Sequence, residues 1–126
     1  MFIKNVGQLT SHGNTTGRQL ALQILEAGLD AADTYKAMRG LVRIGDNRLL
    51  VGGRPELDVS GYGDLVIDLD DVKDIYVLGA GKAIQRQAKA LEDTLGDRLT
   101  AGAITIKKGE EICLERIEDV LNRPAP

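Results

Sequence analysis

A short apolar segment that ends in two closely spaced glycines and a lysine constrains the fold of this chain more than any other feature. Residues 75–78 read Ile-Tyr-Val-Leu, and the next five residues read Gly-Ala-Gly-Lys-Ala. β-Branched and aromatic residues favour a strand, and the glycines permit a tight turn into a helix. The N–H groups at such a junction, together with the positive end of the helix, suit a phosphate or a carboxylate. The segment therefore predicts an anion site formed by Gly79, Ala80, Gly81, Lys82 and Ala83, in which Lys82 adds a full positive charge.

The residues around this junction predict a strand–helix–strand unit. We expect strands at Ile75–Leu78 and Ala101–Ile106, a helix at Lys82–Leu95 between them, and a helix stop at Gly96. A unit of about this length has a right-handed crossover and two parallel strands, which indicates the α/β class. One face of the helix is apolar and consists of Ile84, Ala88, Leu91 and Leu95.

The first third of the chain predicts two helices. Thr16–Gln19 has the Thr-x-x-Gln pattern of a capping box, so Thr16 should be the N-cap of a helix. Asp33 is expected to cap a second, short helix at Thr34–Arg39, which Gly40 ends. The first helix has an apolar face that needs a sheet to cover it, formed by Leu20, Ala21, Ile24, Leu25, Gly28, Ala31 and Ala32.

The middle of the chain predicts short strands. Residues 41–44 and 48–51 flank Gly45-Asp46-Asn47, a spacing typical of a β-hairpin, and residues 65–67 predict another strand. The segment 110–122 suits either a helix or a pair of strands. Together these elements predict an α/β fragment of a Rossmann-like three-layer sandwich with a partly parallel sheet, plus an N-terminal helix and a small hairpin, in a single domain over the whole chain.

Composition and charge argue against several classes of function. The net charge of −3 and the aromatic content of 3% disfavour nucleic-acid binding. Cys113 and His12 are the single residues of their types, which leaves no multi-cysteine or histidine-pair metal site. No segment approaches the ~20 apolar residues of a membrane span, and the first residues lack the apolar core of a signal peptide. We therefore expect a cytoplasmic protein that binds neither nucleic acid nor membrane.

Four aspartates lie close together in the segment before the glycine junction. An EF-hand calcium loop needs a central glycine and a distal glutamate, and neither stands at the required offset here. We therefore expect a solvated turn, and no metal site, at Asp68, Asp70, Asp71 and Asp74.

Three interpretations compete for the glycine junction. A P-loop needs a glycine and a hydroxyl residue where Tyr76 and Ala83 stand. A dinucleotide fingerprint needs a small residue where Ile84 stands and an acidic residue where Lys107-Lys108 stands. We expect Ile84 to impair close packing of helix on strand, although the two lysines would tolerate the extra phosphate of NADP. The third interpretation is structural: the glycines only make the turn, and Lys82 is a solvated residue in the first turn of the helix.

Four further segments form a combination that is specific to one enzyme family. Residues 18–28 follow R-x-x-A-L-x-I-L-x-A-G with the alanine displaced by one position, and residues 31–34 follow A-A-D-P with threonine in place of proline. Residues 79–83 carry an intact G-A-G-K-A, and residues 90–98 read A-L-E-x-x-L-G-D-R. In this combination the chain, over about residues 5–126, resembles the N-terminal segment of the glycerate 2-kinases that carry a MOFRL domain at their C-terminal end.

The resemblance implies a chemistry and a role for the lysine. Members of this family transfer a phosphoryl group from ATP, with Mg²⁺ carried by the nucleotide, to the 2-hydroxyl of D-glycerate in a cleft between two domains. Some relatives are labelled hydroxypyruvate reductases. By resemblance, Gly79–Ala83 bind the nucleotide or the small anionic substrate. Lys82 is then the catalytic residue, which neutralises either the transferring phosphoryl group or the substrate carboxylate.

The chain departs from the family at its last residues and in its length. Arg123 stands where the family's G-H-P-x-P-D loop has histidine, and we expect the rest of the first domain and the MOFRL domain to be absent from this chain. We therefore expect an N-terminal fragment or subunit of a glycerate-2-kinase-like enzyme, inactive without the missing part and completed by a second polypeptide or a homo-oligomer. Two alternatives stay open: a non-catalytic anion- or nucleotide-binding paralogue, and an NADP-linked protein resembling hydroxypyruvate reductase.

Overall fold

The chain forms two compact units, which are described here one by one. The computed structural model describes residues 1–53 and 63–120. The units are Met1–Asp33 and Thr34–Pro126. No helix among the described residues is both long and apolar enough to reach across a lipid bilayer. A single domain over residues 1–126 stays a prediction.

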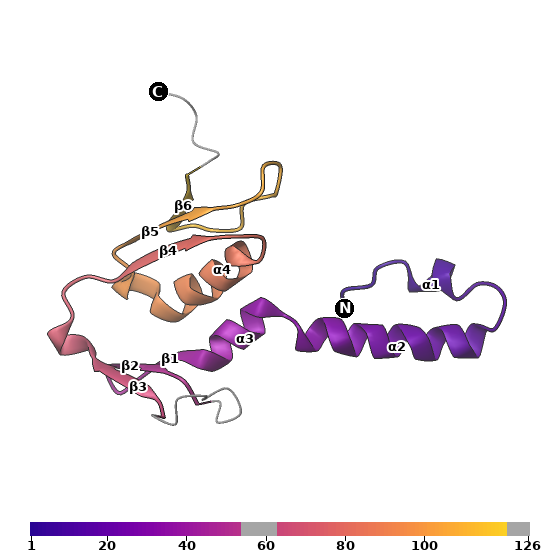
Figure 1. Ribbon diagram of the computed structural model, residues 1–126, viewed down its shortest axis with the longest axis horizontal. Helices are drawn as coiled ribbons and strands as arrows, with labels where there is room; N and C mark the ends of the chain where they lie inside the picture. The colour runs from indigo at the N-terminus through magenta and orange to yellow at the C-terminus, as the bar shows by residue number, and fades with distance from the viewer. Residues whose placement is uncertain (54–62, 121–126) are drawn as a thin grey trace. The chain divides into compact units, whose positions relative to one another are not determined.

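The first unit consists of a leading arm and two helices, α1 (Val6–Leu9) and α2 (Thr15–Ala31) (Figure 1). The capping box predicted at Thr16 is wrong. Asn14 is the N-cap instead, and its side-chain oxygen accepts a hydrogen bond from Gly17 N at 2.9 Å. Asparagine is among the preferred N-caps because its short side chain reaches the N–H of the third helical residue. The N-cap therefore lies two residues earlier than predicted.

α2 contacts the arm on one side and is exposed on its apolar face. The Glu26 carboxylate accepts hydrogen bonds from the N–H groups of Phe2 and, at 3.0 Å, Ile3, which holds the arm against the helix. On the predicted apolar face, more than half of each large side chain is exposed to solvent at Leu20, Ile24 and Leu25. The described residues of this unit therefore leave the face uncovered.

The second unit begins with a helix and an antiparallel sheet. α3 spans Thr34–Leu41, and the sheet contains β1 (Val42–Gly45), β2 (Arg48–Val51) and β3 (Leu65–Asp68) in that order. The turn residues Asp46-Asn47 have φ angles of 49° and 60°, as a type I′ hairpin turn requires. The predicted hairpin is confirmed, and the strand predicted at residues 65–67 pairs with it as β3.

The second sheet of this unit is parallel and contains the predicted strand–helix–strand unit. β4 (Tyr76–Ala80) is followed by α4 (Ile84–Leu95) and β5 (Ala101–Thr105), and β6 (Ile117–Asp119) pairs with β5. The α/β class is therefore confirmed. β4 runs two residues beyond its predicted end. Of the segment left open at 110–122, residues 110–120 are described, and they contain a loop and one short strand.

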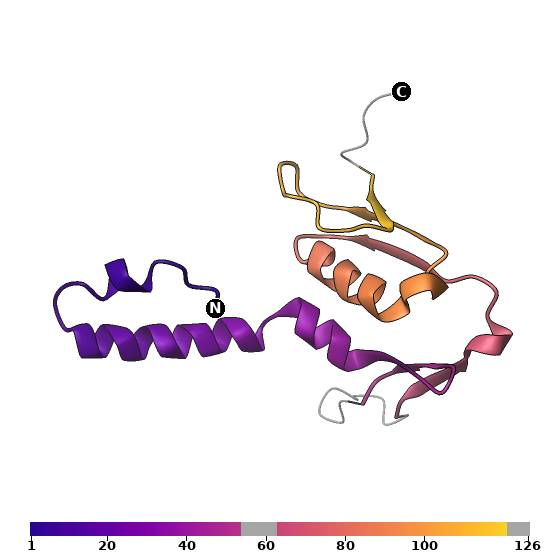
Figure 2. The same cartoon turned by 180° about the vertical axis from the view of Figure 1, so that it is seen from behind.

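α4 covers one face of the parallel sheet, as both views show (Figure 1, Figure 2). The other side of α4 contacts α3 and β1. Successive residues of β4 alternate between the two faces of the sheet: Val77 is 7% exposed, whereas Leu78 is 79% exposed. The core between sheet and helix contains Val77, Ala88, Leu95, Leu99, Ile104, Ile106 and Ile117.

Two short 3-10 helices complete the unit, η2 (Leu69–Asp71) and η3 (Gly96–Arg98). η2 lies in the aspartate-rich segment, where Asp68 accepts a hydrogen bond from Asp70 N at 3.1 Å. The Asp70 carboxylate accepts one from Asn47 Nδ2 at 2.7 Å. The aspartates of this segment are exposed, as expected of a solvated turn.

Candidate functional site

The glycine junction lies at the carboxyl end of β4, where a tight turn leads into α4. Gly81, Lys82 and Ala83 form the turn, and Ala83 is the N-cap. The prediction that Lys82 lies in the first helical turn is wrong. The first helical hydrogen bond runs from Gln87 N to Ala83 O at 3.5 Å, because the chain must leave the turn at Gly81 before the helix can begin. Lys82 therefore precedes α4 and extends from the turn.

Gly79 provides space for the side chain of Ile84. A Cβ atom built on Gly79 would lie 2.6 Å from Ile84 Cγ1, closer than real Cβ contacts allow. The expectation that Ile84 impairs packing of helix on strand is therefore wrong, because Ile84 fills the space beside the missing Gly79 side chain. A dinucleotide fingerprint achieves close packing with a small residue on the helix, at the position of Ile84. In this chain the small residue is on the strand, at Gly79, and the helix carries the large one.

Gly81 has a conformation that other residues rarely adopt. Its φ angle is 121°, and no atom lies within 4 Å of the position a Cβ would occupy. The backbone angle, rather than lack of space, therefore requires glycine at this position.

Lys82 is exposed, and its ammonium group has no carboxylate partner in the described ranges 1–53 and 63–120. Lys89, by contrast, forms ion pairs with Glu92 at 3.2 Å and Asp93 at 2.9 Å. The charge of Lys82 is therefore available to a ligand, as the predicted anion site requires.

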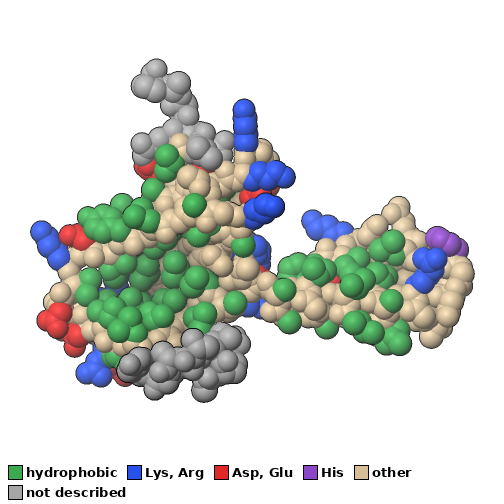
Figure 3. Space-filling model, viewed as in Figure 1, with side chains coloured by type: hydrophobic (Ala, Val, Ile, Leu, Met, Phe, Trp, Pro, Cys, Tyr) green, Lys and Arg blue, Asp and Glu red, His purple; other side chains and the backbone are tan. Residues whose placement is uncertain are grey.

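A cavity of about 230 Å³ lies beside the turn at the carboxyl ends of β4 and β5. Lysine and arginine side chains gather at this end of the sheet (Figure 3). The sequence analysis did not assign Thr105 or Lys107 to the site. The position of Lys107 just after the second predicted strand could have indicated it. The carboxyl ends of two parallel strands lie at the same edge of a sheet, so Lys107 should lie near Lys82. The lining residues are Gly81, Lys82, Thr105, Ile106 and Lys107.

The site offers groups for an anion and not for a bare metal ion. Within the part of the chain that the structure describes, no three His, Cys, Asp or Glu side chains gather where they could hold a metal. The cavity is smaller than the roughly 300–1,000 Å³ of pockets that enclose drug-sized ligands. It therefore suits a phosphoryl group or a small hydroxy acid better than a whole nucleotide.

Comparison with known proteins gives one family and one relative. Residues 20–124 match a family described as a domain of unknown function, DUF4147. The chain belongs to this family. A glycerate 2-kinase from Pyrococcus horikoshii is 29% identical to it over 101 residues, which are 80% of this chain and 20% of the kinase. The predicted resemblance to the N-terminal segment of glycerate 2-kinases is confirmed. No solved structure matches the chain.

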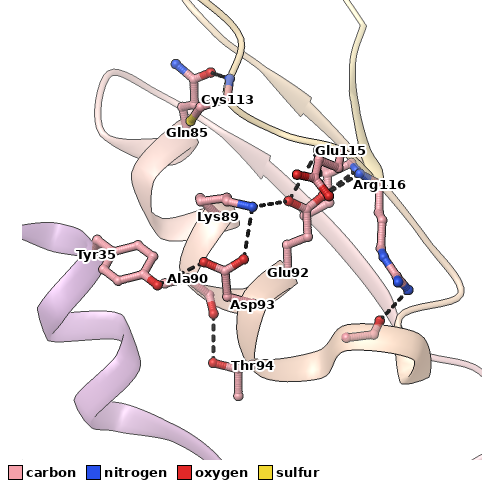
Figure 4. A network of polar contacts seen from close by, with 12 residues as sticks. Tyr35, Gln85, Lys89, Ala90, Glu92, Asp93, Thr94, Cys113, Glu115 and Arg116 are labelled. Atoms are coloured by element: carbon pink, nitrogen blue, oxygen red, sulfur yellow. Dashed lines mark hydrogen bonds and ion pairs between the residues drawn. The ribbon is translucent and has the colours of Figure 1, made fainter.

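Glu92, which belongs to the family motif at residues 90–98, has a structural role in this DUF4147 domain (Figure 4). Its carboxylate is 4% exposed and accepts hydrogen bonds from three successive N–H groups, those of Glu115 at 3.0 Å, Arg116, and Ile117 at 3.1 Å. Lys89 Nζ contacts the second carboxylate oxygen at 3.2 Å. The glutamate in the motif at residues 90–98 thus holds the loop between β5 and β6 against α4.

The environment of Glu92 stabilises its charged form. Burial by itself raises the pKa of this carboxyl, but the N–H groups of residues 115–117 and the Lys89 ammonium outweigh burial and hold the pKa below its ordinary value of 4.5. Lys89 also lowers the pKa of Asp93 by a hydrogen bond, and Tyr35 donates to Asp93 at 2.9 Å. The network therefore connects α3, α4 and the loop before β6.

Two further residues, Cys113 and Arg116, attach this loop in the DUF4147 domain. Arg116 donates to Gly96 O at 2.9 Å and pairs with Asp97 at 2.7 Å. Cys113 N donates to Gln85 Oε1 at 3.0 Å. Gly96 and Asp97 of the family motif thus hold the loop before β6 in place, a role that was not predicted from the sequence.

Proposed function

We propose that this chain supplies the anion-binding part of a glycerate-2-kinase-like active site. In this proposal Lys82 neutralises negative charge on a bound phosphoryl group or on the carboxylate of D-glycerate. One observation carries the proposal: Lys82, which pairs with no carboxylate in residues 1–53 and 63–120, follows a glycine turn and lines a cavity at the carboxyl ends of two parallel strands. The match to a glycerate 2-kinase supports phosphoryl transfer as the reaction in which that lysine would act.

The cavity fits one part of the cofactor that the family implies. A phosphoryl group of ATP would lie between the N–H groups of the turn and the ammonium of Lys82. ATP, bound with Mg²⁺, is the phosphoryl donor in such a reaction. Lys82 would hold the charge that spreads over the phosphoryl oxygens during transfer, which is electrostatic stabilisation without covalent chemistry.

We further propose that turnover needs residues beyond those of this chain. The chain spans 20% of the length of the curated relative it matches. A phosphotransferase must hold both donor and acceptor, and a cavity of about 230 Å³ holds only one small group. The remaining groups would come from a second polypeptide or from another copy of the chain.

A binding and turnover experiment tests the proposal. D-Glycerate and MgATP are titrated separately into the full chain, its Lys82→Ala variant and the control Lys73→Ala, which removes an exposed lysine that does not line the cavity. We expect Lys82→Ala to weaken binding about tenfold or more, equivalent to about 1.4 kcal/mol, and Lys73→Ala to change it less than about twofold. Equal affinity in all three proteins contradicts the proposal.

The same purified proteins also test the two alternative functions, a non-catalytic paralogue and an NADP-linked reductase. A non-catalytic paralogue binds the anion through Lys82 yet forms no ADP, even when mixed with a polypeptide that carries the remainder of a glycerate 2-kinase. An NADP-linked reductase changes the fluorescence of NADPH on binding. We expect no ADP from the chain alone and a flat NADPH titration.

A further inference from the structure

The cavity beside the glycine junction carries a lysine on each of two walls. Lys82 follows β4 and Lys107 follows β5, and both line the cavity. The two strands are parallel, and Ala80 pairs with Thr105 at the end of the ladder. Each lysine therefore stands two residues past the last paired position, at the point where neighbouring strands lie about 4.8 Å apart.

Neither of these two lysines is neutralised by the described part of the protein. No carboxylate within residues 1–53 and 63–120 pairs with Lys82 or Lys107, although Glu110 and Glu111 follow in the same loop. Arg116, further along that loop, does pair with a carboxylate. Two adjacent cations repel each other, so an anion between them would be stabilised by both.

The wall that carries Lys107 is attached to the helix that follows Lys82. On α4, Gln85 accepts a hydrogen bond from Cys113 N, and Glu92 accepts hydrogen bonds from the N–H groups of residues 115–117 (Figure 4). The loop after β5 is thus held at its far end by the same helix whose start positions Lys82. This attachment fixes the end of the loop that begins with Lys107 to the helix that follows Lys82.

We propose that Lys107, together with Lys82 and the hydroxyl of Thr105, binds a phosphoryl group in this cavity. The inference rests on the proposed function and names the ligand class at that site as a phosphate monoester rather than a carboxylate. A phosphate monoester carries about −1.5 to −2 charges and three acceptor oxygens, whereas a carboxylate carries one charge and two oxygens. Two ammonium groups and a hydroxyl match the phosphate in both charge and number of donors.

The test compares two small anions and two neighbouring lysines. Methyl phosphate and acetate are titrated at pH 8 into the full chain by calorimetry, and into the Lys82→Ala, Lys107→Ala, Lys107→Arg and Lys108→Ala variants. Lys108→Ala is the matched control, because Lys108 is the adjacent residue, carries the same charge and does not line the cavity. The thermal unfolding midpoint of each variant shows whether the fold is retained.

We expect the parent chain to bind methyl phosphate about tenfold or more tightly than acetate. Lys107→Ala and Lys82→Ala should each weaken methyl phosphate binding about tenfold or more, Lys107→Arg less than about threefold, and Lys108→Ala less than about twofold. This pattern, with unchanged unfolding midpoints, supports a two-lysine phosphoryl site.

Other results overturn the inference in distinguishable ways. If Lys107→Ala and Lys108→Ala weaken binding equally, the loop contributes only diffuse charge and Lys107 is not a ligand. If only Lys82→Ala weakens binding, the anion site of the proposed function stands without Lys107. Equal affinity for acetate and methyl phosphate overturns the assignment to phosphoryl groups. If the parent binds neither anion, both proposals fall.

Discussion

Gly79 and Gly81 are glycines for two different physical reasons. Gly79 has no side chain because Ile84 occupies the space, whereas Gly81 has open space and a φ angle of 121°. A G-x-G pattern in the sequence does not distinguish these reasons, since each of them selects glycine. The distinction determines which substitution can be compensated.

A double-mutant cycle tests the first reason. We expect Gly79→Ala to lower the free energy of unfolding by about 1–3 kcal/mol, because the added methyl group overpacks against Ile84. In an Ile84→Ala background, the same substitution should cost less than about 0.5 kcal/mol. Urea denaturation of the four proteins gives the coupling. An equal cost in both backgrounds would show that the contact with Ile84 is not the cause.

The second reason predicts the opposite behaviour at Gly81. Gly81→Ala should cost about 1–3 kcal/mol through backbone strain alone. Because no neighbouring side chain causes this cost, Ile84→Ala should not relieve it. Denaturation of Gly81→Ala with and without Ile84→Ala measures this directly, and a relief similar to that at Gly79 would contradict the assignment to backbone strain.

At the scale of the element, α4 acts as the platform to which the parallel sheet and its last loop are attached. Its apolar face packs on Val77, Ile104 and Ile117, and its polar residues hold the loop before β6. β6 pairs with β5 at only three positions, so the hydrogen bonds to Glu92 replace much of the support that a longer strand would have.

Replacing the buried carboxylate tests this role. We expect Glu92→Gln to lower the free energy of unfolding by about 2–3 kcal/mol, because three N–H groups lose a charged acceptor and Lys89 loses one of its two carboxylates. Glu115→Gln, an exposed carboxylate in the same loop, should change it by less than about 0.5 kcal/mol. Hydrogen exchange at residues 115–117 should accelerate in Glu92→Gln alone. Equal exchange in both variants would remove Glu92 as the anchor.

Acid should weaken the same anchor. The pKa of Glu92 is lower in the folded chain than in the unfolded chain, so the folded state binds fewer protons in acid. Its contribution to stability is therefore complete above the unfolded pKa of about 4.5 and is lost as the pH falls through the folded pKa. Between pH 6 and pH 3, the free energy of unfolding should fall less steeply for Glu92→Gln than for the parent or for Glu115→Gln. Parallel slopes for all three would contradict the lowered pKa.

At the scale of the whole molecule, the described residues of the second unit, 34–53 and 63–120, cover one face of the parallel sheet and leave the other exposed. Parallel sheets are normally covered on both faces. Here α4 covers one, and the other carries Tyr76 at 61% and Leu78 at 79% exposure. The proposed second polypeptide, or a second copy of the chain, could bind to the apolar side chains on this face.

Substitutions at adjacent positions of β4 test the difference between the faces. Val77→Asn should cost about 3 kcal/mol or more, because it places an amide in the core. Leu78→Asn should cost less than about 0.5 kcal/mol in the isolated chain. If copies of the chain associate through this face, sedimentation equilibrium should show weaker association for Leu78→Asn than for the parent. Association of equal strength would place any contact between copies elsewhere.

Local patterns predicted most of the elements but not their ends. The apolar spacing of Ile84, Ala88, Leu91 and Leu95 predicted α4, and the Asp46-Asn47 turn predicted the hairpin, because periodicity and turn preference act between near neighbours in the sequence. The cap of α2 and the start of α4 were each misplaced by two residues, since Asn14 competed with Thr16 as a cap and Gly81 delayed the first helical hydrogen bond. Sequence similarity was enough to predict the family.

The sequence by itself determined the strand–helix–strand unit, the hairpin and the glycine turn, and Lys82 as the cation of the candidate site stays its prediction. Only the tertiary structure decided that Ile84 packs over Gly79, that Lys107 lines the same cavity as Lys82, and that Glu92 anchors residues 115–117. The physical reason is how far apart in the sequence the interacting residues are. Helical spacing and turn geometry depend on residues a few positions apart, whereas strand register and buried hydrogen bonds join residues about 25 positions apart, and these pairings exist only after the sheet and helix pack.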